Sequence, residues 1–147
     1  MKVLVPVDGS KHSSEGIKVA SHYAKTKDAQ LTLITVIPSV ADIDLELSAS
    51  DRDRLLESMK KQGEDLLARS AELMRAQGAA HVNTVLATAP SPAQEIVTLA
   101  EKHKIDLIVI GSRGKNANSR FPLGSVAASV VRHSPCCVHV VKDPRWM

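Results

Sequence analysis

Aromatic side chains are scarce in this sequence: one Trp, one Tyr and one Phe make up 2% of its 147 residues. Proteins that bind single-stranded nucleic acid commonly stack the bases on aromatic rings. The sequence also gives no sign of a strongly basic patch, because the net charge is only +3 and no run of five Lys or Arg residues occurs. We therefore expect no nucleic-acid partner and a core built from aliphatic residues.

Long hydrophobic runs are missing as well. The sequence has no stretch of about eighteen consecutive apolar residues, so it predicts no transmembrane helix. The first predicted strand begins at Lys2 and leads directly to Asp8, a pattern unlike that of a signal peptide. We therefore expect a cytoplasmic protein with no membrane partner.

Residues that commonly bind metals are few and scattered. Cys136 and Cys137 are neighbours on a predicted strand, where successive side chains point to opposite faces, so we expect ordinary packing and no disulfide between them. The histidines, at positions 12, 22, 81, 103, 133 and 139, lack ligand spacing. The acidic stretch 39–50 lacks the glycine and terminal glutamate of an EF-hand, so we interpret it as a solvated flap. We predict no metal site built by the protein alone.

Three common signatures of enzymes and cofactor-binding proteins are also absent. The sequence contains no Gly-x4-Gly-Lys-[Ser/Thr] loop, no Gly-x-Gly-x-x-Gly fingerprint and no Gly-x-Ser-x-Gly turn. These patterns would indicate a P-loop, a dinucleotide site and a hydrolase nucleophile, respectively. We therefore predict no catalytic residue.

Short apolar runs alternate with helical patterns along the chain, and apolar residues make up 44% of it. The predicted strands cover residues 2–7, 31–37, 81–87, 105–110 and 136–141, and the predicted helices cover 11–25, 51–77, 91–104 and 126–132. This alternation predicts a single α/β domain, residues 1–147, with an open, mostly parallel sheet, right-handed crossovers and helices on both faces.

Two of the predicted helices carry more specific expectations. In the helix 51–77 the apolar side is predicted to consist of Leu55, Met59, Leu66, Leu73 and Met74. Gly78 is predicted to end this helix. In the helix 11–25 we interpret His12 and His22 as surface residues, with a phosphate contact by His12 as the alternative.

A glycine-rich stretch joins the predicted strand 105–110 to the predicted helix 126–132. It reads Gly111-Ser112-Arg113-Gly114, nine residues, then Gly124-Ser125. Glycine allows a ligand to approach the backbone closely, and the start of a helix attracts phosphate. Arg113, Lys115 and Arg120 add positive charge, which we expect to be exposed. The alternative is a solvated loop with ordinary turn glycines.

A second candidate lies at the end of the first strand, where Asp8, Gly9 and Ser10 follow the apolar run. Parallel sheets bind ligands at the carboxyl ends of their strands, so Asp8 is a candidate ligand residue. Alternatively, Asp8 or Ser10 only caps the following helix.

Three stretches together resemble the universal stress protein family. They are Val3-Leu-Val-Pro-Val-Asp8-Gly-Ser10, the Gly-x2-Gly-x9-Gly-Ser spacing from Gly111 to Ser125, and Ser134-Pro-Cys-Cys-Val-His-Val-Val141. The resemblance implies the ATP-binding subgroup of that family and a Rossmann-like sheet with strand order 3-2-1-4-5. In that order the first and fourth strands are neighbours, so the turn at Asp8 and the glycine stretch would meet at one crevice.

The resemblance also implies ligands, partners and site residues. ATP would contact Pro6, Asp8, Gly9, Val36, Gly111, Ser112, Arg113, Gly114, Gly124, Ser125 and Val126. Adenine would lie near Pro6, Asp8 and Val36. Mg²⁺ could arrive with the nucleotide. The edge strand Cys136–Val141 would pair two copies into a homodimer.

Three functions remain open on the sequence. The leading one is an ATP-binding regulatory protein in a stress response, with an unknown protein partner. The second is a slow ATPase or phosphoryl-transfer enzyme with Asp8 as metal ligand or base. The third is a dimeric interaction module whose nucleotide site is vestigial.

Overall fold

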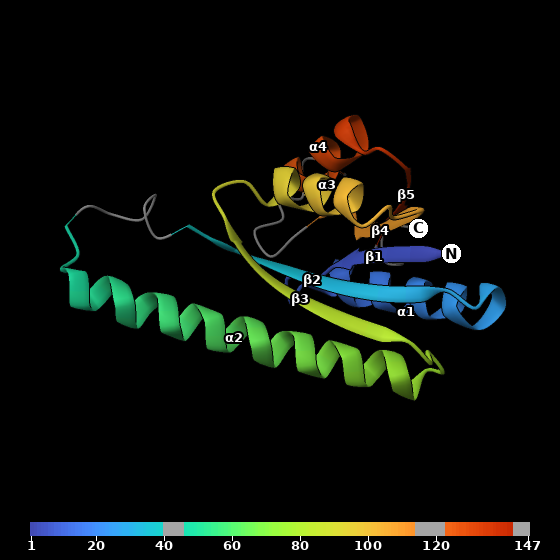
Figure 1. Ribbon diagram of the computed structural model, residues 1–147, viewed down its shortest axis with the longest axis horizontal. Coiled ribbons are helices and arrows are strands. Elements are labelled where there is room, and N and C mark those ends of the chain that lie inside the picture. The colour runs from blue at the N-terminus through green and yellow to red at the C-terminus, as the bar shows by residue number, and fades with distance from the viewer. Residues whose placement is uncertain (40–45, 114–122, 143–147) are drawn as a thin grey trace.

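The computed structural model describes residues 1–39, 46–113 and 123–142, which form five strands and four helices in alternation (Figure 1). The elements are β1 (Lys2–Pro6), α1 (Lys11–Lys27), β2 (Gln30–Pro38), α2 (Ala49–Ala76), β3 (Val82–Ala89), α3 (Pro92–Lys102), β4 (Leu107–Gly111), α4 (Ser125–His133) and β5 (Cys137–Val141). Every predicted element is present, with ends that lie at most two residues from those expected.

All five strands belong to one parallel sheet in the order β3-β2-β1-β4-β5. The central strand is β1, in which Val3 pairs with Leu31 of β2 on one side and with Leu107 of β4 on the other. The predicted α/β class and strand order are therefore confirmed.

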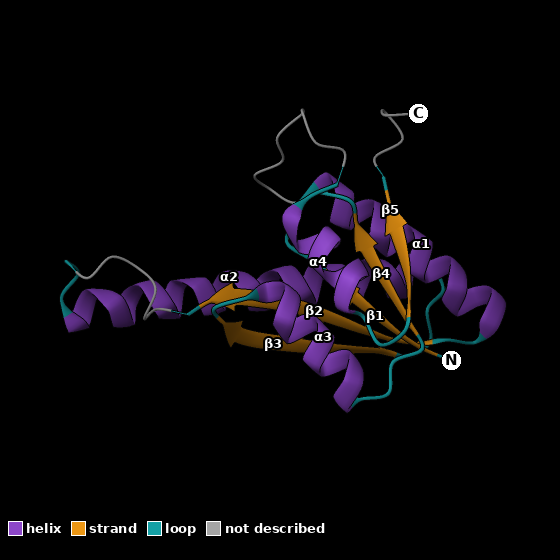
Figure 2. Ribbon diagram, turned by 90° about the horizontal axis from the view of Figure 1, so that it is seen from above, coloured by secondary structure: helices purple, strands orange, loops and turns teal. Residues whose placement is uncertain are grey.

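The sheet is covered by two helices on each face. In Figure 1 α3 and α4 lie above the sheet and α1 and α2 below it, and Figure 2 shows the same layers from the α3–α4 side. Val3 and Val5 pack into the core on the α1–α2 side, whereas Leu4 packs into the core on the α3–α4 side. All three are completely buried. This two-sided burial explains why β1 reads as a continuous apolar run in the sequence.

The long helix α2 is packed along only part of its length. Its buried residues all lie in its second half, namely Gly63, Leu67, Ser70, Ala71 and Met74. The other half extends past the sheet (Figure 1). The predicted place of Leu73 on the apolar side is wrong, since Leu73 is 40% exposed while its neighbour Met74 is fully buried. Successive helical residues are rotated by about 100°, so a stripe centred on Met74 turns Leu73 toward solvent.

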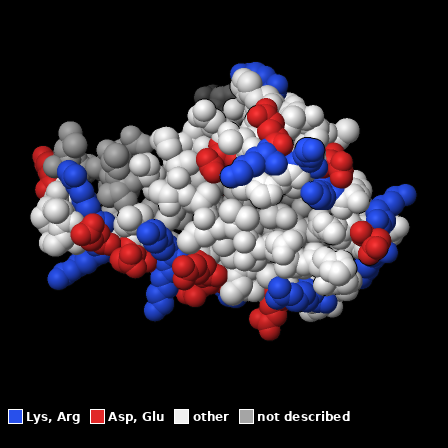
Figure 3. Space-filling view, in the orientation of Figure 1, with Lys and Arg blue, Asp and Glu red and all other residues white. Residues whose placement is uncertain are grey.

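Charges are mixed on the visible surface. In Figure 3, Lys and Arg side chains alternate with Asp and Glu side chains along α2, in agreement with a solvated helix face.

None of the helices in the described part of the chain combines the length and the apolar character that a membrane crossing requires.

Candidate functional site

The carboxyl ends of β1 and β4 lie next to each other at the centre of the sheet, because these strands pair in parallel. From β1 the chain proceeds through α1 to β2 on one side, and from β4 it proceeds through α4 to β5 on the other. This is the topological switch point at which open α/β sheets bind ligands. The structure thus brings the Asp8 turn to the same edge of the sheet as the described ends of the glycine-rich stretch, the two candidates that the sequence singled out.

The turn after β1 is held by its own polar side chains. The backbone amide of Ser10 donates to Oδ1 of Asp8 at 2.9 Å, and Gly9 between them has a φ of 84°, which favours glycine. The hydroxyl oxygen of Ser10 accepts a hydrogen bond from the amide of Ser13 at 3.1 Å and caps α1. The capping alternative is therefore correct for Ser10, and Asp8 orders the turn from a half-buried position.

Gly111 at the end of β4 lies against the first turn of α1. A Cβ atom built on Gly111 would lie 2.7 Å from the carbonyl carbon of His12 and 2.8 Å from its carbonyl oxygen. Side chains do not tolerate such distances to backbone atoms, so a glycine is needed here for helix packing. The structure thus gives Gly111 a packing role against α1, and its contact with a ligand stays a prediction.

Ser112 connects three elements. Its amide donates to the carbonyl of Val141 in β5 at 2.8 Å, and its carbonyl accepts from the amide of Gly124 before α4 at 2.6 Å. Its hydroxyl oxygen lies 3.2 Å from Nδ1 of His12 in α1. With 1% of its surface exposed, Ser112 is a buried junction at the start of the glycine-rich stretch.

The prediction that His12 is a surface residue is wrong, because only 7% of it is exposed. Its imidazole is turned toward Ser112, and its backbone contacts Gly111. The sequence offered no signal for this burial, since Ser112 is 100 positions away in the chain. His22, on the same helix, is exposed as predicted.

Arg113 differs from expectation in the same way. We expected an exposed cation, but the residue is 7% exposed. Its charge is therefore largely removed from solvent, and salt screens it less than it screens the charge of a solvated side chain. The predicted site residue Gly114 and the basic residues Lys115 and Arg120 lie outside the described part of the chain.

The start of α4 differs from the starts of the other three helices. Serine side chains cap α1, α2 and α3, with Ser10, Ser48 and Ser91 each accepting a backbone N–H. The residue before α4 is Gly124, which has no side chain to form such a bond. The predicted residues Ser125 and Val126 form the first turn of α4 and are exposed. Unpaired amides at a helix start, together with the helix dipole, attract anions.

Backbone geometry alone does not require glycine before α4. Gly124 has φ −71° and ψ 164°, and the serine cap of α1 has nearly the same angles, φ −76° and ψ 164°. A serine would therefore fit this backbone at position 124. The absence of a side chain leaves the first amides of α4 to some other acceptor.

Pro6 and Val36, the predicted adenine neighbours, lie on the α3–α4 face of the sheet. Val36 packs against the core on that face, and so does Leu4, two residues before Pro6 in β1. Alternate residues of a strand share a face, so Pro6 lies there as well. Both residues are half-buried. The structure thus places them on the same side of the sheet as α4.

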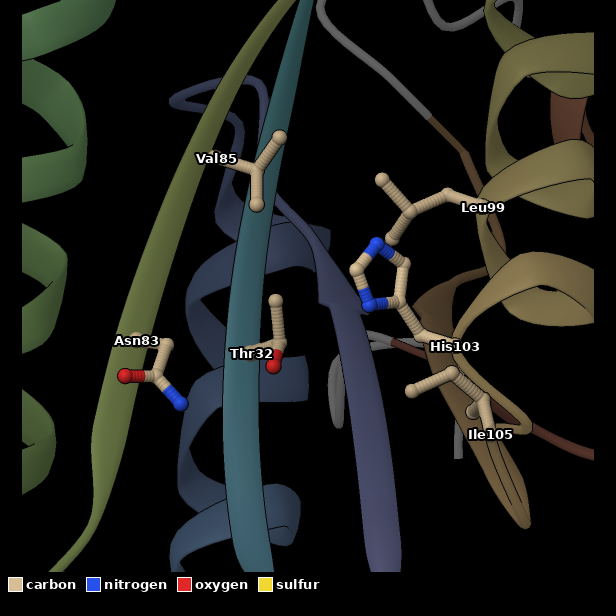
Figure 4. A pocket seen from close by; sticks show the side chains of 6 residues that line it. All are labelled: Thr32, Asn83, Val85, Leu99, His103 and Ile105. Carbon is tan, nitrogen blue, oxygen red and sulfur yellow. The ribbon is translucent and has the colours of Figure 1, made fainter.

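A pocket elsewhere in the molecule does not belong to this site. It has a volume of about 190 Å³ and is lined by Thr32, Asn83, Val85, Leu99, His103 and Ile105 (Figure 4). Thr32 and Asn83 pair near the beginnings of β2 and β3, whereas the switch point lies at the carboxyl ends of the strands. Nor do His, Cys, Asp or Glu side chains gather in groups of three suited to a metal ion in the described ranges.

Comparison with known proteins was decisive for the family. A family model described as the universal stress protein family matches residues 1–142. The chain belongs to the universal stress protein family. The predicted family is thereby confirmed, whereas its ATP-binding subgroup stays a prediction.

Relatives share sequence and fold along nearly the whole chain. A universal stress protein of Methanocaldococcus jannaschii is 36% identical over 144 residues, covering 98% of this chain and 83% of the relative. The solved structure of universal stress protein UspA from Lactobacillus plantarum is 29% identical, with a TM-score of 0.83 over 96% of this chain and 97% of that one. A universal stress protein solved in complex with cAMP is 25% identical, with a TM-score of 0.72 and 96% coverage of both chains.

Proposed function

We propose that this universal stress protein binds ATP at the switch point between β1 and β4 and acts as a nucleotide-dependent regulator in a stress response. The observation that carries the proposal is the start of α4. There, a helix whose cap residue Gly124 has no capping side chain begins next to the end of β4, which pairs with β1, in the place where this fold class binds ligands. A phosphate group supplies acceptor oxygens for these amides, which receive no hydrogen bond from the side chain of the cap residue.

The orientation of the nucleotide follows from the positions of the candidate residues. The triphosphate would meet Gly124, Ser125 and Val126 at the start of α4, with Arg113 nearby. Gly114, which lies outside the described residues, stays a predicted contact of the phosphates. The adenine would extend over the α3–α4 face toward Pro6 and Val36, passing Asp8 and Gly9. The structural relative with bound cAMP supports an adenine nucleotide as the ligand class, because cAMP has the same base, ribose and a phosphate.

Mg²⁺ would be brought by the nucleotide. Magnesium prefers oxygen ligands and commonly keeps several waters when it binds through substrate phosphates. Asp8 is the carboxylate among the candidate site residues, and its Oδ1 already accepts a hydrogen bond from the amide of Ser10. We therefore assign the metal to the phosphate oxygens.

A homodimer through β5 is part of the proposal. β5 lies at one edge of the sheet, and its central residues Val138, His139 and Val140 are only half-buried. Val131 on the neighbouring helix α4 is 47% exposed. An apolar edge strand is prone to pair with another chain, and pairing with a symmetry mate covers it. We expect this dimer to work in the cytoplasm.

The test is the nucleotide content and ATP affinity of the purified protein. We expect nucleotide to be released on heating, identified by absorbance and mass, and ATP to bind in isothermal titration. Gly124→Val, and likewise Gly114→Val, should weaken ATP binding by at least about tenfold, equivalent to about 1.4 kcal/mol. Gly124 has angles that any residue adopts, so the Gly124→Val protein should remain folded.

Ala49→Val is the matched control, since it adds the same branched side chain at the start of α2, which has a serine cap. It should bind ATP like the wild type. If the wild type neither carries nor binds nucleotide, the proposal is wrong and a vestigial site is favoured. If Gly124→Val binds ATP as tightly as the wild type, the phosphates do not lie at α4.

A further inference from the structure

His12 and Ser112 form a buried contact that the proposed ATP site does not use directly. We propose that His12 is a positioning residue of the nucleotide site, which holds Ser112 and through it the start of α4. The inference rests on the proposed function, because the property that His12 would control is ATP affinity. It concerns a residue for which the sequence patterns predicted a surface position.

The side chain of His12 is the first link. Its Nδ1 lies 3.2 Å from the hydroxyl oxygen of Ser112, and both residues are more than nine-tenths buried. Among the described residues, this is the polar contact that joins the side chain of Ser112 to α1. A hydrogen bond between two buried groups is costly to leave unmade, so it restricts the position of the hydroxyl.

The backbone of His12 provides a second, independent contact. Its carbonyl group occupies the space that a Cβ of Gly111 would need. The first turn of α1 therefore touches the last residue of β4 with its backbone and the next residue, Ser112, with its side chain. Two contacts to consecutive residues fix both the position and the orientation of the chain as it leaves β4.

Ser112 passes this constraint on to α4. Its carbonyl accepts the 2.6 Å hydrogen bond from the amide of Gly124, the residue at the N-terminal end of α4. Its amide donates a hydrogen bond to the carbonyl of Val141 in β5, and this bond anchors the backbone of Ser112 to the sheet. Consequently, loss of the His12 contact loosens Ser112 at its side chain and changes the placement of the amides that would meet phosphate.

The experiment measures ATP affinity of the full-length protein by isothermal titration. His12→Ala should weaken binding by roughly three- to tenfold, the usual range for loss of one neutral hydrogen bond. His12→Asn should restore affinity to within about twofold of the wild type, because the Asn amide places a hydrogen-bonding atom near the position of Nδ1. His22→Ala is the control, with the same substitution at an exposed position of the same helix.

A double-mutant cycle tests whether His12 acts through Ser112. Ser112→Ala should weaken ATP binding as His12→Ala does, and the double variant should be no weaker than the weaker single variant. Ser112→Ala removes a single oxygen atom, so it keeps the test valid if His12→Ala does not fold. Thermal unfolding without nucleotide shows whether each variant is folded at the titration temperature.

The outcomes separate this inference from the proposed function. If the wild type does not bind ATP, both are overturned. If the wild type binds ATP and the His12→Ala protein binds it equally well, only the inference is wrong. If His12→Asn fails to restore affinity, or if the effects of the two single variants simply add, His12 does not act through its hydrogen bond to Ser112.

Discussion

The backbone amide of Gly124 donates a 2.6 Å hydrogen bond to the carbonyl oxygen of Ser112. This bond joins the residue that follows β4 to the residue that precedes α4. The two described ends of the glycine-rich stretch therefore meet at one point, at the carboxyl end of the central strands. The start of α4 is held in place by β4, and a ligand that binds there meets an already ordered helix end.

A serine at position 124 is expected to compete with phosphate. Gly124→Ser would introduce, on angles almost identical to those of Ser10, a hydroxyl that accepts from an amide in the first turn of α4. The unliganded protein should gain a few tenths of a kcal/mol, the usual difference between glycine and serine caps. ATP should bind more weakly, because the hydroxyl occupies an amide that the phosphate needs.

Thermal unfolding and titration of the Gly124→Ser protein measure both effects. Ser91→Gly is the reverse control, at the capped start of α3. It should lower stability by a similar amount and leave ATP affinity unchanged. Tighter ATP binding by Gly124→Ser would contradict a role of the α4 amides in phosphate binding.

Gly111→Ala should destabilise the fold. The added Cβ would lie 2.7–2.8 Å from backbone and Cβ atoms of His12, so α1 or β4 has to shift. Overpacking of this kind costs about 1–3 kcal/mol. Chemical denaturation of the variant without nucleotide should show a lower free energy of unfolding than that of the wild type.

Gly16→Ala is the matched substitution on the opposite side of the same contact. Its Cβ would meet the amide nitrogen of Gly111 at 3.9 Å, an ordinary van der Waals distance. Alanine is the better helix former, so this variant should gain about 0.5–1 kcal/mol. Equal and small effects of the two substitutions would show that α1 does not pack on β4 as described.

Any ATP hydrolysis should be slow. Among the described residues, Asp8 is the carboxylate at the switch point, and it already accepts a hydrogen bond from Ser10. Typical enzymes turn over at about 10 per second. We expect a rate that is orders of magnitude lower, measured as phosphate release from ATP with Mg²⁺. A rate near the typical value that Asp8→Ala abolishes would identify the protein as an enzyme.

The dimer should depend on the surface formed by α4 and β5. Val131→Glu places a charge on the exposed apolar surface of α4, and burial of an unpaired charge in an interface is strongly unfavourable. Light scattering at micromolar concentration should show a dimer for the wild type and a monomer for this variant. Leu73→Glu is the control, since Leu73 is similarly exposed, at 40%, on α2. A monomeric wild type would rule out the dimer.

Local pattern in the sequence was sufficient for the elements of the fold. β1 could be recognised because burial on both faces makes Val3, Leu4 and Val5 apolar without interruption. The start of α3 could be recognised because serine is preferred at the N-cap and proline in the first turn of a helix. In the structure Ser91 is the N-cap and Pro92 begins the helix. The glycine spacing likewise identified the stretch between β4 and α4, and the family resemblance supplied the strand order.

The tertiary structure alone decided which of these residues meet. Sequence patterns of period two or 3.6 indicate which face of a strand or helix is buried. They do not define the edge of that face, so a residue there, such as Leu73, can be misplaced. They carry no information on contacts between distant segments. His12 is buried because α1 packs on the end of β4 and Ser112, 100 residues later, faces its imidazole. The specific geometry of the site thus arises from the parallel pairing of β1 with β4, which sequence periodicity does not encode.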